Sequence, residues 1–160
     1  DMVARWGEGG RMEGQKSSAL GEIMGVHTDR PVFDTLAALV SHGVFDRHPK
    51  LKVAAVELGA GWVPELFRKM RIAYGKMPQA FGFRDPCDTL RDHVWVMPFY
   101  EDELQPVVDC IGVDRIIYGS DYPHPEGFAD PQEYAAELTE FSEADTRKIM
   151  RDNLRALSLG

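Results

Sequence analysis

Residues 51–70, LKVAAVELGAGWVPELFRKM, decide the fold because they predict a strand, a loop and a helix in direct succession. Residues 51–56 form a short, mostly apolar and partly β-branched run of the kind that occupies a buried strand. Glu57 and the glycine-containing loop 58–61 close that strand. Apolar residues at helical spacing, with a proline in the first turn, then predict a helix over 62–77.

The same strand and helix unit recurs along the rest of the chain. Two further apolar runs, 94–97 and 115–118, predict strands, and the periodic segments around them predict helices. Buried strands that alternate with helices indicate an α/β fold with a parallel sheet and right-handed crossovers. The remaining predicted helices lie over 31–47, 85–92, 101–111, 131–141 and 142–157, and residues 1–30 are loop-rich with one short helix around 18–24.

Composition limits the classes of partner. The chain has 160 residues, 44% of them hydrophobic, which suffices for one domain with a core. Its formal net charge of −8, without a basic run, argues against nucleic acid and anionic membranes as partners. No apolar run approaches the roughly 18 to 20 residues of a membrane span, and no signal-peptide pattern opens the chain, so we expect a soluble protein.

The two cysteines and the first residue bear on the setting of the protein. Cys87 and Cys110 are too few for a disulfide framework and do not form a zinc knuckle. They favour a reducing, cytoplasmic location. The chain opens with Asp1 instead of methionine, which suggests a processed or truncated portion of a longer protein.

Polar side chains follow each predicted strand. Glu57 ends the first strand and Tyr100-Glu101-Asp102 the second, while Asp121 and His124 follow the third within IIYGSDYPHPEG, residues 116–127. Because the carboxyl ends of parallel strands point the same way, these groups should gather at one edge, where parallel α/β folds build their sites. An isolated Asp121 could instead cap its own turn. The convergence favours a site residue.

Four blocks of sequence carry a resemblance to a known family. They are HGVFDRHPKLKVAAVELGAGWVPELFRKM, HVWVMPFYEDEL, RIIYGSDYPHPEG and, at the end of the chain, IMRDNLRALSLG. In this order they resemble the C-terminal part of amidohydrolase-related proteins, the group that includes aminocarboxymuconate-semialdehyde decarboxylase. The resemblance covers nearly all of the chain after about residue 30, and it is more specific for the family than for a substrate.

The resemblance implies a metal-dependent (β/α)₈ TIM barrel, of which residues 1–160 supply one C-terminal portion with the last three strands and their flanking helices. Asp121 matches the family's aspartate after the eighth strand, which binds a divalent metal, usually zinc, and can accept a proton from the metal-bound water. The family completes this site with a His-x-His pair and further histidines, and this chain contains no His-x-His. Zinc is therefore expected in the full-length protein, and the 160 residues alone could lack it.

The chain departs from the family at Glu57. Where the family's sixth strand usually ends in His-Gly-Gly, this chain has Glu57-Leu58-Gly59-Ala60-Gly61. A carboxylate in place of the imidazole must take over its acid–base role, or activity is altered or lost. The two groups differ by about two units in unperturbed pKa. Glu57 is thus either a catalytic residue or a solvated carboxylate at a strand end.

Two further residues are candidates for contact with the substrate. His124, between two prolines, either faces the substrate or only orients its loop. Trp62 could wall an apolar pocket, although packing in the core is the simpler interpretation. His93 precedes a strand, so we expect it at the opposite, structural end of the sheet. The acidic run 101–103 is expected mainly to favour the start of the next helix.

Two functions remain open. The first is the C-terminal part of a metal-dependent hydrolase or nonoxidative carboxy-lyase, a decarboxylase, for a small carboxylated or cyclic substrate, with Asp121 and Glu57 as catalytic residues. The alternative is a noncatalytic half-barrel whose open sheet edges make it a homo-oligomer or pair it with a missing N-terminal half. A flavodoxin-like binding module is a third and weaker option, because residues 59–61 lack the phosphate-loop fingerprint.

Overall fold

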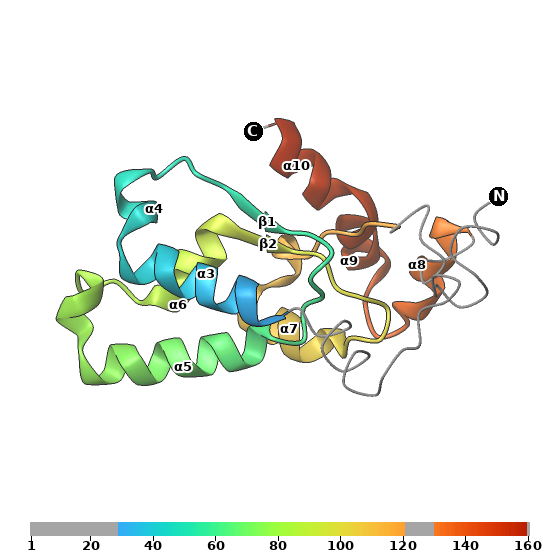
Figure 1. Ribbon diagram of the computed structural model, residues 1–160. Helices are drawn as coiled ribbons and strands as arrows, with labels where there is room; N and C mark the ends of the chain where they lie inside the picture. The colour runs from blue at the N-terminus through green and yellow to red at the C-terminus, as the bar shows by residue number, and fades with distance from the viewer. Residues whose placement is uncertain (1–28, 121–129, 160) are drawn as a thin grey trace, which may run out of the picture.

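A short parallel sheet lies at the centre of the computed structural model, which describes residues 29–120 and 130–159 (Figure 1). Strand β1 spans Val53–Ala55 and strand β2 spans Val94–Val96, with Val53 opposite Val94 in a parallel register. The predicted parallel pairing is confirmed, although both strands are shorter than predicted.

The third predicted strand is reduced to a single bridge. Ile116 pairs with Val96 in the parallel sense. The amide of Ile117 donates to the carbonyl oxygen of Val96 at 2.9 Å, and the next amide, that of Tyr118, donates to the carbonyl oxygen of Ile149 at 3.2 Å. The expectation of a full strand over 115–118 is therefore wrong, because a 3₁₀ turn occupies Val113–Arg115 and the chain makes only the bridge at Ile116 beyond it.

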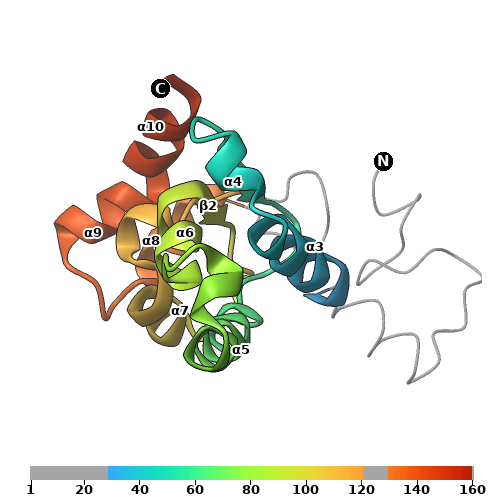
Figure 2. The same ribbon diagram turned by 90° about the vertical axis from the view of Figure 1, so that its left-hand side faces the viewer.

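Helices make up most of the rest of the described chain. Figure 1 shows α3, α5 and α6 on one side of the strands and α8, α9 and α10 on the other, and Figure 2 shows α5, α6 and α7 grouped together. No helix among the described residues is long and apolar enough to cross a membrane. The α-helices are α3 Asp29–Ser41, α4 Val44–Arg47, α5 Val63–Lys76, α6 Pro86–His93, α7 Leu104–Ile111, α8 Tyr134–Glu137, α9 Glu143–Arg147 and α10 Asn153–Leu159; the 3₁₀ turns η1 Pro78–Phe81, η2 Val113–Arg115 and η3 Pro131–Glu133 and the π-helical turn η4 Lys148–Asp152 connect them.

Side-chain caps explain where two helices begin. The carboxylate of Asp85 accepts a hydrogen bond from the Cys87 amide at 2.8 Å, and α6 starts at the next residue, as predicted. The hydroxyl of Ser142 accepts a hydrogen bond from the Asp145 amide at 3.2 Å at the start of α9. Both caps satisfy amides that a helix leaves without a partner in its first turn.

Two predicted helices are interrupted. The helix expected over 31–47 divides into α3 and α4 because Gly43 adopts φ 61°, a left-handed conformation that glycine takes most readily. The helix expected over 131–141 is a 3₁₀ turn followed by one helical turn. It ends because Leu138 leaves the helical conformation and is buried in the core.

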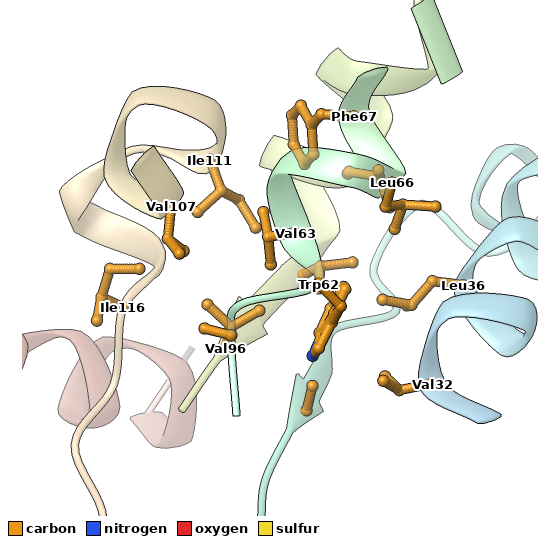
Figure 3. Packing of buried hydrophobic residues seen from close by; sticks show 14 of the residues in the cluster. Val32, Leu36, Trp62, Val63, Leu66, Phe67, Val96, Val107, Ile111 and Ile116 are labelled. Carbon is orange, nitrogen blue, oxygen red and sulfur yellow. The ribbon is translucent and has the colours of Figure 1, made fainter. Parts of the chain in front are cut away.

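The main hydrophobic core lies between the sheet and the helices (Figure 3). Leu36 from α3 and Val107 from α7 approach from opposite sides, with Trp62 and Val63 at the start of α5 between them. Val63 and Val107 are fully buried. Burial of each large apolar side chain contributes about 1.5 to 3 kcal/mol relative to exposure, so this packing fixes the start of α5 against the sheet.

Alternate residues of the strands form a second, smaller cluster on the opposite face. Trp95, Met97 and Ile117 are all buried there, and Leu157 of α10 packs against them. Both faces of the strands are thus covered, as is usual for parallel sheets.

His93 lies at the amino end of β2 and is buried. Its Nδ1 is 2.8 Å from the carbonyl oxygen of Leu51, and its ring stacks on Phe45 with centroids 4.6 Å apart. This environment agrees with the structural role predicted for His93, at the end of the sheet opposite the loops described next.

Candidate functional site

Three loops follow the carboxyl ends of the strands. Residues 56–61 follow β1, residues 97–102 follow β2, and the third loop begins at Tyr118. A Cβ on Gly119 would overlap Sδ of Met97, so the start of the third loop lies against the start of the second. The structure therefore brings the described parts of the predicted edge together.

Asp102 joins the first two loops. Its Oδ2 accepts one hydrogen bond from the Ala60 amide at 2.7 Å and a second from the Phe99 amide at 2.8 Å. Hydrogen bonds to an ionised acceptor are roughly twice as strong as neutral ones. The expectation that the acidic run 101–103 mainly favours the next helix is therefore wrong for Asp102, whose carboxylate binds the two loops.

Because Asp102 binds the two loops, the acidic run 101–103 precedes α7 and is not part of it. The helix predicted over 101–111 begins only at Leu104. Its N-cap residue, Glu103, makes no side-chain cap hydrogen bond. Pro106 lies in the first turn, where the absence of an amide hydrogen costs little.

Two glycines allow the close approach of the first two loops. Gly59 has φ 60°, and a Cβ at this position would lie 2.8 Å from Cδ2 of Phe99. A Cβ on Gly61 would lie 3.0 Å from Oδ1 of Asp102. A side chain at position 59 would displace the ring of Phe99, and one at position 61 would crowd the carboxylate of Asp102, so glycine at both positions suits the close contact of the two loops.

Glu57 adopts a left-handed backbone conformation at the end of β1. Its φ is 56°, and the residue is exposed. For a residue other than glycine, a sparsely populated conformation of this kind costs about 1 to 3 kcal/mol and persists only where the surroundings enforce it. Such residues cluster at functional sites, which supports a site role for Glu57; its catalytic role stays a prediction.

Trp62 supports the first loop from within the core. The side chain is 5% exposed, and its Nε1 donates to the carbonyl oxygens of Leu58 at 3.2 Å and Gly59 at 3.0 Å. This agrees with the simpler interpretation of Trp62 as a packing residue. Its predicted contact with substrate stays a prediction.

Tyr118 and Tyr134 stack on each other near Asp102, where the first two loops meet. Burial first, and then the charge of Asp102, raise the pKa of Tyr134 to about 12. Burial first, and then the charge of Asp130, raise the pKa of Tyr118. Within the described part of the chain, the Tyr118 hydroxyl oxygen is buried without a hydrogen-bond partner. Both phenols therefore stay protonated at neutral pH.

Asp121 and His124, predicted to bind metal and substrate, lie outside the described residues. Their roles stay predictions.

Comparison with known proteins identifies the family. A sequence profile of the amidohydrolase family matches residues 19–157. The chain belongs to the amidohydrolase family. The predicted resemblance, including its connection to decarboxylases of this family, is thus confirmed.

Curated relatives of this amidohydrolase chain include two decarboxylases. The 2-amino-3-carboxymuconate-6-semialdehyde decarboxylase of Dictyostelium discoideum is 27% identical over 123 residues, and the gamma-resorcylate decarboxylase of a Rhizobium species is 29% identical over 124 residues. Each match covers 74% of this chain but only 34% and 37% of the respective relative. The chain therefore spans about a third of the length of these relatives.

Solved structures of amidohydrolases share the fold. A Mycobacterium avium subsp. paratuberculosis amidohydrolase is 44% identical, with a TM-score of 0.82 over 99% of this chain and 39% of its own. A dihydroxybenzoic acid decarboxylase from a Polaromonas species, with bound manganese and the inhibitor 2-nitroresorcinol, is 22% identical, with a TM-score of 0.65 over 89% of this chain and 47% of its own. The second likeness concerns the fold alone.

The described residues do not by themselves form a metal site. Among residues 29–120 and 130–159, no three His, Cys, Asp or Glu side chains gather in a way that could hold an ion. A zinc site needs about three protein ligands. A metal site of this amidohydrolase chain would therefore need ligands beyond those described, such as the predicted Asp121.

Sequence reasoning missed the loop-binding role of Asp102 and the stacking of Tyr118 on Tyr134. A usable signal for Asp102 was present, because a strand-end aspartate and a Gly-x-Gly loop after the neighbouring strand together suggest a close approach. No comparable signal marks the tyrosine pair, since α8 and the third loop meet only in the folded chain.

Proposed function

We propose that this chain is the C-terminal portion of a metal-dependent amidohydrolase-family enzyme, a hydrolase or nonoxidative carboxy-lyase for a small carboxylated or cyclic compound. The observation that carries the proposal is the junction of the strand-end loops, where Asp102 binds two loops and Glu57 is strained. Sites of parallel α/β folds lie at this edge. The decarboxylases among the curated relatives favour decarboxylation over hydrolysis.

In this proposal, the described α/β unit supplies the last three strands of a (β/α)₈ barrel, and a preceding segment supplies the others. The Mycobacterium structure supports it, because this chain matches 39% of that protein with a TM-score of 0.82. In addition, β1 has a strand neighbour only on its β2 side among the described residues. In a closed barrel, the open edge of β1 would pair with a preceding strand.

The proposed roles divide between four residues. Asp121 binds a divalent metal and accepts a proton, His124 contacts the substrate, and Trp62 supports the loop that lines the site. When a carboxylate leaves as carbon dioxide, the electron pair of the broken carbon–carbon bond stays on the substrate, and that carbon must gain a proton. We assign the transfer of this proton to the side chain of Glu57, in the role of general acid.

We expect the metal to be zinc or manganese, and the Polaromonas relative contains manganese. The substrate class follows the small carboxylated aromatic compounds named for the relatives, including 2,6-dihydroxybenzoate. A cytoplasmic location, which the two free cysteines favour, remains a proposal.

The test uses the intact protein with its native metal content measured by mass spectrometry. A panel of 2,6-dihydroxybenzoate and related hydroxylated benzoates is assayed for carbon dioxide release. We expect about one divalent ion per barrel, no turnover in Asp121→Asn, and a loss of about 10² to 10⁴ in kcat for Glu57→Gln. The exposed carboxylates of Asp109 and Glu143 offer controls, and D109N and E143Q should leave turnover unchanged. Full turnover in D121N would refute the proposal.

The open edge of β1 also supports the alternative function, a noncatalytic half-barrel that self-associates or pairs with a missing N-terminal half. Light scattering after size exclusion distinguishes the two. A metal-free homo-oligomer of these 160 residues supports the alternative, and a metal-bound monomer contradicts it.

A further inference from the structure

The loop that carries Glu57 is held from two directions. On one side, its carbonyl groups at Leu58 and Gly59 accept hydrogen bonds from Trp62. On the other side, its amide at Ala60 donates to the carboxylate of Asp102. Two consecutive peptide groups of the loop, 58–59 and 59–60, are thus fixed just after Glu57, and the second of them is held from both sides.

This arrangement explains how Glu57 remains in its left-handed conformation. A strained backbone relaxes unless its surroundings leave it no alternative. Trp62 is itself fixed by burial in the main core, whereas Asp102 is fixed by a second hydrogen bond, from the Phe99 amide. The two anchors therefore connect the strained residue both to the core and to the loop after β2.

We propose that Asp102 is a positioning residue that holds Glu57 in its site conformation by binding the loop after β1 to the loop after β2. Asp102 does not reach the substrate in this inference, and it acts through Glu57. The inference rests on the proposed function for the role of Glu57, but the loop connection itself does not.

The charge of Asp102 also reaches α8, since it contributes to the raised pKa of the buried Tyr134. Tyr134 in turn stacks on Tyr118 at the start of the third loop. Asp102 therefore binds the first two loops and lies near Tyr134, the residue that packs against the start of the third loop. This location suits a residue that sets their relative positions.

Both hydrogen bonds end on the same oxygen of Asp102, which makes a sharp pair of variants possible. In Asp102→Asn, the amide oxygen can take the place of Oδ2 and accept both bonds, whereas Asp102→Ala accepts neither. Asp85→Ala is the matched control, because Asp85 also accepts a backbone hydrogen bond but caps α6, which leads into the amino end of β2.

The first measurement is hydrogen exchange of the intact protein, followed by mass spectrometry at the Ala60 and Phe99 amides. We expect exchange at both amides to rise at least about tenfold in D102A and to stay near the wild-type rate in D102N and D85A. Unchanged exchange at both amides in D102A would overturn the inference. This readout needs no substrate, so it decides the loop connection even if the proposed enzymatic function fails.

The second measurement is turnover of 2,6-dihydroxybenzoate, or of the most rapidly converted acid of the panel. We expect D102A to lower kcat at least about tenfold with little change in KM. D102N should retain most of the wild-type kcat, and D85A should leave kcat unchanged. In an E57Q background, D102A should cost less than about twofold, because the residue it positions is already disabled. An equal loss from D102A in both backgrounds would show a general structural role and reject the inference.

Discussion

Tyr134 of α8 stacks on Tyr118, with ring centroids 4.8 Å apart and ring planes 11° apart. The contact places Tyr134, which is the more deeply buried of the two, against Tyr118, the first residue of the third strand-end loop. α8 therefore packs against the candidate site through a pair of phenols whose pKa values are both raised.

The stability of the protein should fall in alkaline solution through Tyr134. Burial and then the charge of Asp102 raise its pKa to about 12, above the value of about 10 in an unfolded chain. The folded state then keeps a proton that the unfolded state loses. The stabilisation is complete below about pH 10 and is lost as the pH rises from about 10 to 12, by at most about 2 to 3 kcal/mol. Urea midpoints of wild type and Tyr134→Phe, measured from about pH 9 to 11.5, should show a steeper decline for wild type. Parallel curves would contradict this assignment.

Asn153 anchors the last helix to the end of the third strand segment. Its buried side-chain amide donates to the carbonyl oxygens of Val113 at 2.8 Å and Ile116 at 2.7 Å. Asn153→Ala leaves both carbonyl groups without this donor and should lower the free energy of unfolding by about 2 to 4 kcal/mol. Urea denaturation measures the change. Ser158→Ala, on the exposed face of the same helix, is the control and should cost less than about 0.5 kcal/mol.

Glycine in place of Glu57 should separate stability from activity. Glu57→Gly removes the strain of a left-handed conformation, worth about 1 to 2 kcal/mol, although glycine loses more backbone entropy on folding. We expect the thermal midpoint to stay equal or rise, while turnover falls as in Glu57→Gln. Glu57→Val, with a branched side chain at the same φ, should be clearly less stable than both. A large loss of stability in the glycine variant would refute the strain at this position.

The two cysteines should differ in reactivity. Cys87 is buried, and burial first, then the charge of Asp85, raise the pKa of its thiol to about 11. Because the thiolate is the reactive form, Cys87 should resist alkylation at about pH 8 until the protein unfolds. Cys110 is partly exposed and should react first. Peptide mapping after a time course of iodoacetamide treatment measures both rates, and rapid labelling of Cys87 in the folded protein would count against its burial.

Local signals in the sequence predict the helices better than the sheet. The start of α6 follows from Asp85, whose capping hydrogen bond spans two residues. The break at Gly43 was also a local feature, but apolar periodicity on both sides concealed it. The shortening of the third strand could not be predicted, because it depends on the 3₁₀ turn that ends at Arg115 and on how η4 packs against Tyr118 in the folded chain.

The candidate site also has features that the sequence predicts and others that only the folded chain shows. The location of Glu57 at a shared edge could be predicted because parallel strands align their carboxyl ends. For the connection through Asp102, the sequence holds only a partial signal, the strand-end aspartate and the Gly-x-Gly loop, because the contact itself depends on how two loops from separate strands pack in three dimensions. The roles of Asp121 and His124 remain predictions that come from the family resemblance.

The alternation of side chains in β2 has a consequence for insertions and deletions. Val94 and Val96 face the helices, whereas Trp95 and Met97 face the second cluster. A deletion of one residue at the amino end of β2 would exchange the side chains on the two faces of the strand. The indole of Trp95 would then have to fit into the space that a valine fills in the main core. Changes in chain length should therefore be confined to the connecting segments, and the spacing between Val94 and Met97 should stay constant wherever this fold is retained.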